Sequence, residues 1–498
     1  MLSPVTPRNL ITHPRCRPED LGKPLPDSPH ATSVALPCWD HVVGYEEGRP
    51  KIVAAMELGY PRFVIHPRVT ALFSWFEAHY GAAGERCLAF PSAGVAKRCA
   101  AFLEGKGWAT RQHDPREGVE IHGVFFPEEA LADAKAFWQH FGKIVSSRRA
   151  EAFLENAGAP EGGATAKQRI RARIAGLTGE PEKNVWLFPS GMAALSRALR
   201  LAQARTPGAK SIQLGFPYVD VLKIQTIAGP GAHFVADYDL EAVEALLKQE
   251  PISAVVCEFP GNPLLRGCSL PALGDLAHAH GVPLIVDDTP ATYFNVQTFP
   301  HADMVVTSLT KAFSGVGDVM AGALVLHQGS PFQEEAERFM AENDEDLLWD
   351  GDALVLEANS RDFETRMAQV NATGEALCDW LRGHPAVADL YYPKYTMKTA
   401  YDEVMRAGGG YGGLFSLVLH DAPRNAPRFY DALEVSKGPS LGNNFTLACP
   451  YTLLAHYGEL DWAEEHGVFR YLVRVSVGLE PLGDLKARFA RALDGLGR

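Results

Sequence analysis

The sequence predicts an α/β fold, in which helices sandwich a mostly parallel sheet and a smaller C-terminal α+β domain follows. Between about residues 146 and 330, short apolar segments alternate with helical segments, which is typical of a parallel sheet covered on both faces. After a helical stretch around 353–384, hairpin-like strands at 414–419 and 472–477 precede a last helix. The 498 residues are enough for two or three domains of ordinary size.

The individual elements follow from apolar runs bounded by turn residues. The predicted strands of the central sheet are 185–188, 211–214, 254–257, 283–286, 304–307 and 323–327. Helices are expected between them at 193–203, 240–248 and 270–280, and an earlier one at 69–80. The strand-turn-helix pattern at 87–94 is similar to the segment 185–192, but one short similarity does not indicate a duplication.

These patterns divide the chain into three parts. We predict an N-terminal extension at 1–145, a large domain at 146–365 and a small α+β domain at 366–498. The first 30 residues are proline-rich and aperiodic. The first 17 carry three arginines and no acid but no apolar segment, which favours a disordered start over the alternative, an organelle presequence.

Composition excludes several classes of function. The net charge of −13, without a basic block, argues against nucleic acid or an anionic membrane as a partner. No segment approaches the roughly 18 apolar residues of a membrane helix. The eight cysteines stand singly, without the paired spacing of a metal site, which predicts reduced thiols in the cytoplasm and neither a disulfide framework nor a bound metal.

Lys311 and Asp287 carry the main functional signal. Lys311 ends the segment Thr-Ser-Leu-Thr-Lys after an apolar strand, and Asp287 closes an earlier one. A lysine whose amine is neutral can hold an aldehyde cofactor as a Schiff base, and a carboxylate can keep a ring nitrogen protonated. Ligands of such sheets bind beyond the carboxyl ends of the strands. The two residues therefore predict pyridoxal 5′-phosphate (PLP) as the cofactor, with Asp288 as the alternative partner of the ring.

Two segments offer donors for the cofactor's phosphate. The residues Pro-Ser-Gly-Met at 189–192 follow a strand and open a helix, whose free N–H groups and dipole favour an anion. An ordinary tight turn is the alternative interpretation. The hydroxyls of Ser308 and Thr310, two residues apart, follow the predicted strand at 304–307. The predicted phosphate ligands are Ser190, Gly191, Met192, Ser308 and Thr310.

Three further residues are placed to contact the ring or the substrate. Asn262 either donates to the cofactor's phenolic oxygen or belongs to a simple Asn-Pro turn. Tyr218 either stacks on the ring or is buried near a strand end. Arg474 is a charge inside an apolar strand, which predicts a bidentate grip on a substrate carboxylate, with an internal salt bridge as the alternative. The predicted catalytic residues are Lys311, Asp287 and Tyr218.

Taken in this order, these residues resemble the Cys/Met-metabolism family of fold-type-I PLP enzymes. The stretch 258–322 carries most of the resemblance, and the blocks PSGMAAL at 189–195 and RVSVGLE at 474–480 extend it. The front of the chain, including GYPRF at 59–63, is similar to the long fungal-type cystathionine γ-synthases, as is KGPSLGNNFTLACPYTLLAHY at 437–457.

The resemblance implies a sheet of the seven-stranded type and a homotetramer built from active dimers. It implies that Arg148 reaches across from the partner subunit to the phosphate, and that Ser440 and Arg474 hold the carboxylate of an amino-acid substrate. The reaction it implies is γ-replacement on an O-acylated homoserine by cysteine, which gives cystathionine.

Alternatives remain open at this point. A γ-lyase keeps the same residues but eliminates the γ-substituent, and a homoserine-ester sulfhydrylase uses another nucleophile. Three departures from the family bear on this choice: Ser146 replaces a common tyrosine, Pro439 a bacterial glutamate and Lys223 a bacterial arginine. A non-catalytic subunit of this fold would be expected to lose the lysine, the ring aspartate or the carboxylate arginine, and all three are present. An N-terminal segment that acts as a separate binding module is a further alternative.

Overall fold

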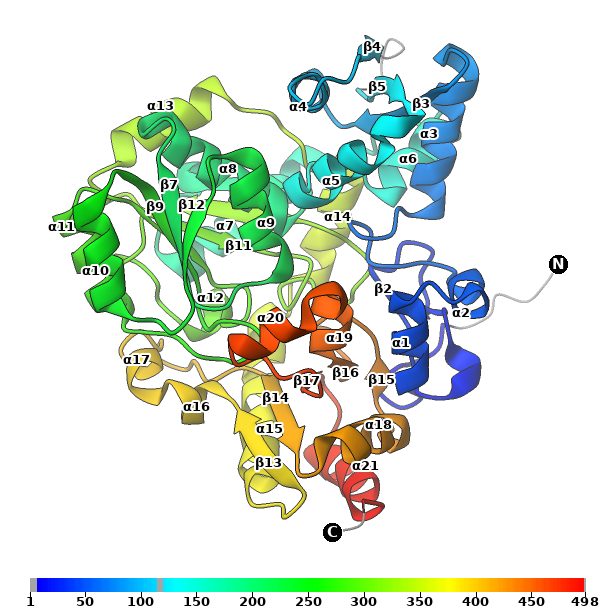
Figure 1. Ribbon diagram of the computed structural model, residues 1–498, viewed down its shortest axis with the longest axis vertical. Helices are drawn as coiled ribbons and strands as arrows, with labels where there is room; N and C mark the ends of the chain where they lie inside the picture. The colour runs from blue at the N-terminus through cyan, green and yellow to red at the C-terminus, as the bar shows by residue number, and fades with distance from the viewer. Residues whose placement is uncertain (1–6, 114–119, 497–498) are drawn as a thin grey trace.

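The centre of the molecule is a seven-stranded sheet in the computed structural model, which describes residues 7–113 and 120–496 (Figure 1). The strand order is β6-β12-β11-β10-β9-β7-β8, and only β12 runs antiparallel to its neighbours. The strands are β6 (Val185–Phe188), β7 (Lys210–Leu214), β8 (Ala232–Val235), β9 (Ile252–Glu258), β10 (Leu284–Asp287), β11 (Met304–Thr307) and β12 (Gly322–Leu326). The predicted fold class is confirmed, although the sequence prediction missed β8.

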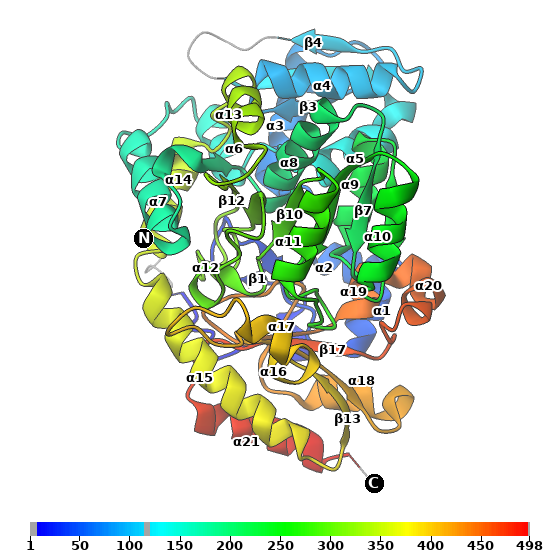
Figure 2. The same ribbon diagram turned by 90° about the vertical axis from the view of Figure 1, so that its left-hand side faces the viewer.

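Helices cover both faces of this sheet, with α10 and α11 on one side and α8 and α9 on the other (Figures 1 and 2). The helical elements of this region are α7 (Gly163–Thr178), η3 (Glu182–Asn184), α8 (Gly191–Arg205), α9 (Val219–Ala228), α10 (Leu240–Gln249), α11 (Leu270–Ala279), α12 (Thr292–Asn295), α13 (Gln333–Glu342), α14 (Asp350–Asn359) and α15 (Phe363–Arg382). Strands β9 to β12 are almost wholly buried, as the continuous apolar runs predicted.

The C-terminal region is a five-stranded sheet in the order β13-β14-β17-β16-β15, packed on helices. Strands β14 and β17 are antiparallel neighbours, as their hairpin-like patterns predicted. The elements are β13 (Val387–Tyr391), α16 (Pro393–Thr396), α17 (Lys398–Asp402), β14 (Leu414–Leu419), α18 (Ala422–Ala432), β15 (Ser436–Lys437), β16 (Leu447–Pro450), α19 (Tyr451–His456), η4 (Tyr457–Glu459), α20 (Leu460–Glu465), β17 (Val473–Ser476) and α21 (Leu482–Asp494).

A small unit with its own core stands at the top of Figure 1, formed by residues 67–154. Its three-stranded antiparallel sheet has the order β3-β5-β4. Its elements are α3 (Pro67–Tyr80), β3 (Glu85–Phe90), α4 (Ala93–Glu104), β4 (Arg111–His113), β5 (His122–Pro127), η2 (Glu128–Ala130), α5 (Leu131–Phe141) and α6 (Ser147–Leu154). The expected helix at 69–80 and the strand-turn-helix at 87–94 are both present.

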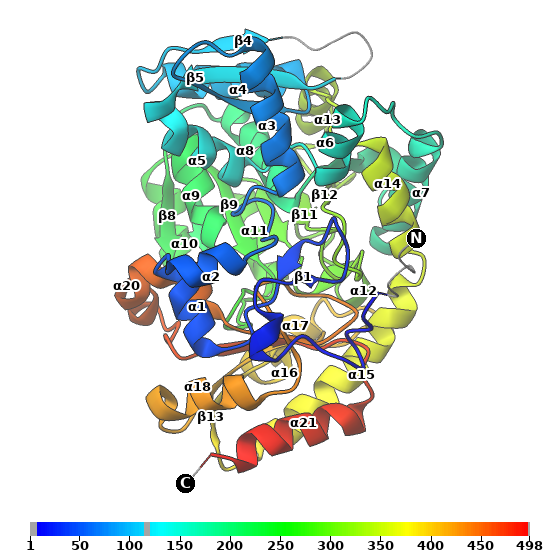
Figure 3. The same ribbon diagram turned by 90° about the vertical axis from the view of Figure 1, so that its right-hand side faces the viewer.

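Residues 7–66, which we call the N-terminal arm, run along the C-terminal region and lead into the unit formed by residues 67–154 (Figure 3). The arm holds η1 (Pro18–Asp20), β1 (Pro24–Leu25), β2 (Ser33–Val34), α1 (Trp39–Glu46) and α2 (Pro50–Ala55). Its residues Trp39 and Val42 share one apolar core with residues of β14 and β17. The N-terminal extension therefore consists of two parts that pack in different places.

The expectation of a disordered start is wrong for residues 7–17. Leu10 is buried in a small apolar cluster with Leu447, and the backbone N–H of Arg15 donates to Ser436 Oγ at 3.1 Å. Residues 1–6 lie outside the described residues. Tertiary contacts, which local composition does not reveal, order this segment. The division into 1–145, 146–365 and 366–498 stays a prediction. Over the described ranges, no helix is long and apolar enough to cross a membrane.

Candidate active site

A cavity of about 460 Å³ opens beyond the carboxyl ends of strands β9, β10 and β11. The arm, the central region and the small domain all contribute to its walls. It is lined by Val34, Leu36, Tyr45, Glu46, Tyr60, Arg62, Phe63, Gln139, Gly191, Met192, Tyr218, Val219, Lys223, Glu258, Asn262, Asp287, Thr289, Pro290, Ser308, Lys311, Pro439, Leu441, Cys449, Tyr451, Leu454, Ala455 and Arg474. Most of the predicted site residues are among them.

Lys311 lies in the turn after β11 and points into this cavity. Its Nζ donates to Ser440 Oγ at 3.1 Å and lies 4.5 Å from the centre of the Tyr60 ring. Burial lowers the pKa of the Lys311 amine below its usual range, and the nearby guanidinium of Arg474 reinforces the shift. The amine is thus suited to react with an aldehyde, because only its neutral form is nucleophilic.

Asp287 ends strand β10 and faces the cavity from the floor. It is paired across the sheet with Glu258, the last residue of β9. Burial raises the pKa of Asp287, and burial together with Asp287 raises the pKa of Glu258 to about 8. Glu258 is held by the backbone N–H groups of Tyr218 and Asn262. Because the two carboxyl groups disfavour each other's ionisation, the pair carries one negative charge, which suits a cationic ring nitrogen above this floor.

Strand alternation places Asp288 on the opposite side. Its Oδ1 accepts a hydrogen bond from Thr307 Oγ1, and it does not line the cavity. The structure thus puts Asp287, and not Asp288, where a cofactor ring would lie.

The start of helix α8 provides the expected anion site. Gly191 and Met192 line the cavity beside Ser308. A Cβ on Gly191 would lie 2.8 Å from Ser308 Cβ and 3.0 Å from its Cα, so only glycine allows this close approach.

Two predicted phosphate ligands sit just behind this surface. Ser190 caps α8: its Oγ accepts from Ala193 N at 3.1 Å and donates to Gly142 O at 2.7 Å. Thr310 Oγ1 donates to Ala321 O at 3.2 Å and accepts from Ala321 N at 3.0 Å. In this structure, both hydroxyls therefore hold the backbone around the site.

Arg474, on β17, extends into the cavity from the small domain. Its guanidinium donates to Asn262 Oδ1 at 3.2 Å, Pro439 O at 2.7 Å and Ser440 O at 3.1 Å. It also lies over the Tyr451 ring. Among the described residues, no carboxylate forms an ion pair with it. The buried charge is thus held by neutral acceptors and remains able to bind a carboxylate ligand.

Tyr218 caps the start of α9 at the cavity wall, and its hydroxyl accepts a hydrogen bond from Arg62 Nη2 at 2.7 Å. Arg62 belongs to the arm and is anchored by Asp220 Oδ2 at 2.6 Å and Gln139 O at 2.8 Å. A residue from the arm therefore fixes the orientation of a tyrosine predicted to stack on the ring.

The sequence analysis missed Tyr60 and Arg62 as site residues. Burial alone would raise the pKa of Tyr60, but the cations Lys311 and Arg62 outweigh it and lower that pKa. The signal was present in the segment GYPRF, where a tyrosine and an arginine stand two residues apart in an otherwise apolar run.

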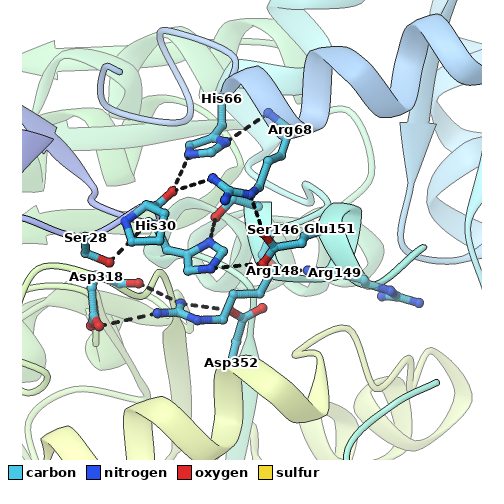
Figure 4. Close-up of polar contacts among 12 residues, drawn as sticks. Ser28, His30, His66, Arg68, Ser146, Arg148, Arg149, Glu151, Asp318 and Asp352 are labelled. Atoms are coloured by element: carbon cyan, nitrogen blue, oxygen red, sulfur yellow. Dashed lines mark hydrogen bonds and ion pairs between the residues drawn. The ribbon is translucent and has the colours of Figure 1, made fainter. Parts of the chain in front are cut away.

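Arg148 does not line the cavity of its own chain. It lies instead beside Asp318 and Asp352 (Figure 4). Its guanidinium donates to Asp318 O at 2.6 Å and contacts Asp318 Oδ2 at 3.3 Å and Asp352 Oδ1 at 3.4 Å. Nearby, His30 and Arg68 both bind Glu151, which joins the arm to α3 and α6. The predicted role of Arg148 across a subunit interface stays a prediction.

The cavity fits PLP in three respects. The Lys311 amine is buried and has no carboxylate partner among the residues that the structure describes, so it suits the aldehyde of that cofactor. The start of α8, where only glycine fits, suits the phosphate, and the carboxylate of Asp287 suits the ring nitrogen. The protein is a PLP-dependent enzyme of fold type I, in the class of transferases and lyases.

Comparisons with known proteins define the family. Residues 163–494 match the model for the Cys/Met metabolism PLP-dependent enzymes, and residues 68–146 match the N-terminal domain of fungal trans-sulfuration enzymes. The chain belongs to the Cys/Met-metabolism family of PLP-dependent enzymes.

Individual relatives span nearly the full length. A cystathionine gamma-synthase of Neurospora crassa is 36% identical, with 96% of this chain and 98% of the relative covered. An L-2-amino-4-chloropent-4-enoate dechlorinase/desaturase of Streptantibioticus cattleyicolor is 32% identical, with 95% and 98% covered. Among solved structures, cystathionine gamma-lyase from Lactobacillus plantarum in complex with L-serine aligns with a TM-score of 0.57 and 25% identity, covering 66% of this chain and 87% of that one.

Proposed function

We propose that the enzyme catalyses γ-replacement on an O-acylated homoserine, with cysteine as the nucleophile and cystathionine as the product. The observation that carries the proposal is the link between Arg474 and Lys311 through Ser440. The Ser440 carbonyl accepts from Arg474 at 3.1 Å, and its hydroxyl accepts from Lys311 Nζ at 3.1 Å. An amino-acid carboxylate bound at Arg474 therefore places the neighbouring carbons close to the Lys311 amine.

The residues of the site would act as follows. When bound, PLP supplies an electron sink for charge that develops on the substrate carbons. Lys311 removes the proton from Cα and moves a proton at Cβ, while Asp287 keeps the ring nitrogen protonated. Tyr218, oriented by Arg62, stacks on the ring. The Cγ–O bond breaks and the acid leaves as a carboxylate, after which the cysteine sulfur forms a Cγ–S bond and its thiol proton is released.

Product analysis tests this proposal. The PLP-loaded enzyme is given O-acetyl- or O-succinylhomoserine, each with and without cysteine, and the products are identified by mass spectrometry. Cystathionine that forms only with cysteine supports γ-replacement, and the faster ester identifies the donor. Ketobutyrate and ammonia at equal rates with and without cysteine would overturn it.

A γ-lyase is the second candidate, because elimination needs the same Lys311, Asp287 and Arg474. The relative named as a dechlorinase/desaturase supports this alternative, as do the departures at Pro439 and Lys223, both of which line the cavity. A homoserine-ester sulfhydrylase is the third. Amino acids with a γ-halide, and sulfide in place of cysteine, are the substrates that separate these reactions from γ-replacement.

We further propose a homotetramer of active dimers in which Arg148 binds the phosphate of the partner subunit's cofactor. The position of Arg148 outside the cavity of its own chain supports this arrangement. Mixed Lys311→Ala and Arg148→Ala subunits test it, because a dimer of the two variants regains one intact site only if Arg148 acts across the interface. Light scattering gives the number of subunits, and an inactive mixture of folded variants would contradict the proposal.

We also propose a cytoplasmic location. The eight cysteines are all free thiols in the structure, and thiols persist in a reducing compartment. Fractionation of cells with an antibody to the protein checks this, and recovery in an organelle fraction would contradict it.

A further inference from the structure

Two charged residues of the cavity have no role in the proposed reaction. The charged lining residues that are already assigned or paired are Lys311, Asp287, Arg474, Arg62 and Glu258. This leaves Glu46 and Lys223, which are of opposite charge and come from different walls of the same cavity.

Glu46 is the last residue of helix α1 in the N-terminal arm. It is half-buried, and its carboxylate makes no hydrogen bond or ion pair with any residue that the structure describes. Burial raises the pKa of Glu46 to about 7. A carboxylate at the negative end of a helix is unfavourable for stability, so neither the helix nor a neighbouring cation accounts for its position.

Lys223 lies on helix α9 and lines the same cavity. Its ion-pair partner is Glu459, whose Oε1 is 3.9 Å from Nζ, at the limit of an ion pair. The side chain is 44% exposed, so this contact is weak and the ammonium remains available to a ligand.

We propose that Glu46 and Lys223 form a subsite for the second substrate, in which Glu46 receives the ammonium group and Lys223 the carboxylate of an amino acid that carries a thiol. The inference rests on the proposed γ-replacement. Arg474 holds the carboxylate of the donor, so the nucleophile needs its own recognition elements. A carboxylate and an ammonium facing the same space match a zwitterionic amino acid and disfavour inorganic sulfide, which offers neither group.

Thiols that lack one group at a time test the subsite. Wild-type enzyme and the variants Glu46→Gln and Lys223→Gln are assayed with cysteine, with cysteamine, which lacks the carboxylate, and with 3-mercaptopropionate, which lacks the ammonium. Glu46→Gln should lower kcat/KM for cysteine and cysteamine by about 10- to 100-fold, the range of one charge-assisted hydrogen bond, and leave 3-mercaptopropionate unchanged. Lys223→Gln should lower kcat/KM for cysteine and 3-mercaptopropionate and spare cysteamine.

The matched control is Glu47→Gln. Glu47 is the neighbouring carboxylate, is exposed, binds Arg49 and Tyr457, and does not line the cavity, so the variant should behave as wild type. A pH series adds a second readout. The ratio of kcat/KM for cysteamine to kcat/KM for 3-mercaptopropionate should rise through pH 7 in wild type, as Glu46 loses its proton, and should stay constant in Glu46→Gln.

The outcomes separate the two proposals. If wild type forms no thioether from any thiol, the proposed function fails and the subsite fails with it. If wild type forms cystathionine but the variants affect all three thiols equally, γ-replacement stands and the subsite is overturned. Consumption of the ester without a thiol should be the same in Glu47→Gln as in wild type.

Discussion

Two strand-turn-helix segments of this protein have nearly the same local sequence but different surroundings. Strand β3 ends in Phe-Pro-Ser before α4, and strand β6 ends in Phe-Pro-Ser before α8. In both, the serine caps the helix: Ser92 Oγ accepts from Val95 N and Ser190 Oγ from Ala193 N, each at 3.1 Å. Both helix starts thus present the same N–H groups and the same dipole to an anion.

The difference lies in what faces each helix. At α4, the carboxylate of Glu345 accepts from Ser92 Oγ at 2.7 Å and from Arg98 Nη2 at 2.5 Å. At α8, the cavity lies in that place. The protein fills one anion site with its own side chain and leaves the other for a ligand. A helix start therefore becomes a cofactor site only when the tertiary fold brings reactive groups, and no internal carboxylate, to it.

The largest effect should come from removing the Lys311 amine, the reactive group in the cavity at the start of α8. Lys311→Ala should lower turnover by at least about 1,000-fold and abolish the visible absorbance of covalently held cofactor, because alanine has no amine to form the Schiff base. Absorption spectra and peptide mapping after borohydride reduction measure this. A reduced cofactor found on another lysine would show that Lys311 is not the anchor.

Asp287→Asn should leave the cofactor bound but lower turnover by about 100- to 1,000-fold. The amide cannot keep the ring nitrogen protonated, so the ring withdraws electrons poorly. Cofactor content after dialysis and kcat are the measurements. Asp288→Asn is the matched control, because that side chain faces Thr307 and away from the cavity; normal turnover in Asp287→Asn would move the role to another group.

A methyl group at each helix start compares the two anion sites directly. Gly191→Ala should weaken PLP binding by about 10- to 100-fold, since the new Cβ meets the Ser308 backbone at 3.0 Å. In Gly94→Ala, the new Cβ meets Glu345 Oε1 at 2.1 Å, the end of a flexible side chain, so PLP binding should not change. Equilibrium titration of both apoenzymes with PLP decides, and equal affinities would contradict the comparison.

Glu345→Gln should have the smallest effect, on stability alone. It removes the negative charge beside Arg98 and Arg197 and should lower the free energy of unfolding by about 1–3 kcal/mol without changing kcat. Burial would raise the pKa of Glu345, but Arg98 and Ser92 outweigh it and lower that pKa.

The sign of the pH dependence follows from this lowered pKa. The stabilisation by Glu345 is complete above the pKa of about 4.3 expected in the unfolded chain, and is lost as the pH falls through the folded value. Urea unfolding should therefore separate wild type from Glu345→Gln at pH 7 and bring them together in acid. A gap of the same size in acid would mean that the charge of Glu345 does not contribute.

Much of the fold and of the central site could be predicted because the signals are local. Lys311 and Asp287 follow apolar strands directly, and in a parallel sheet such strand ends meet at one edge. Strand β8 was missed because it is a short edge strand, partly exposed and interrupted by His233, without the apolar run of its neighbours.

The rest depends on contacts between distant parts of the chain. Arg62 reaches Tyr218 over 156 positions, and no periodicity near Arg62 indicates its partner. Similarly, the sequence locates Ser190 and Thr310 near the site, but only the fold shows that their hydroxyls bind the backbone. The cations around Glu345 come from three separate segments, so their convergence could not be predicted either; they are Arg98, Lys143, Arg197 and Arg200.

The walls of the cavity extend in sequence from Val34 to Arg474, which has a consequence for synthesis of the protein. A ribosome adds about 5–20 residues per second, so the arm leaves the exit tunnel about 20–90 s before the strand that carries Arg474. During this interval Trp39 and Val42, which are later buried on the small domain, have no partner to cover them. The newborn chain should therefore depend on chaperones at its N-terminus, and catalytic activity should appear only once the last domain has been made.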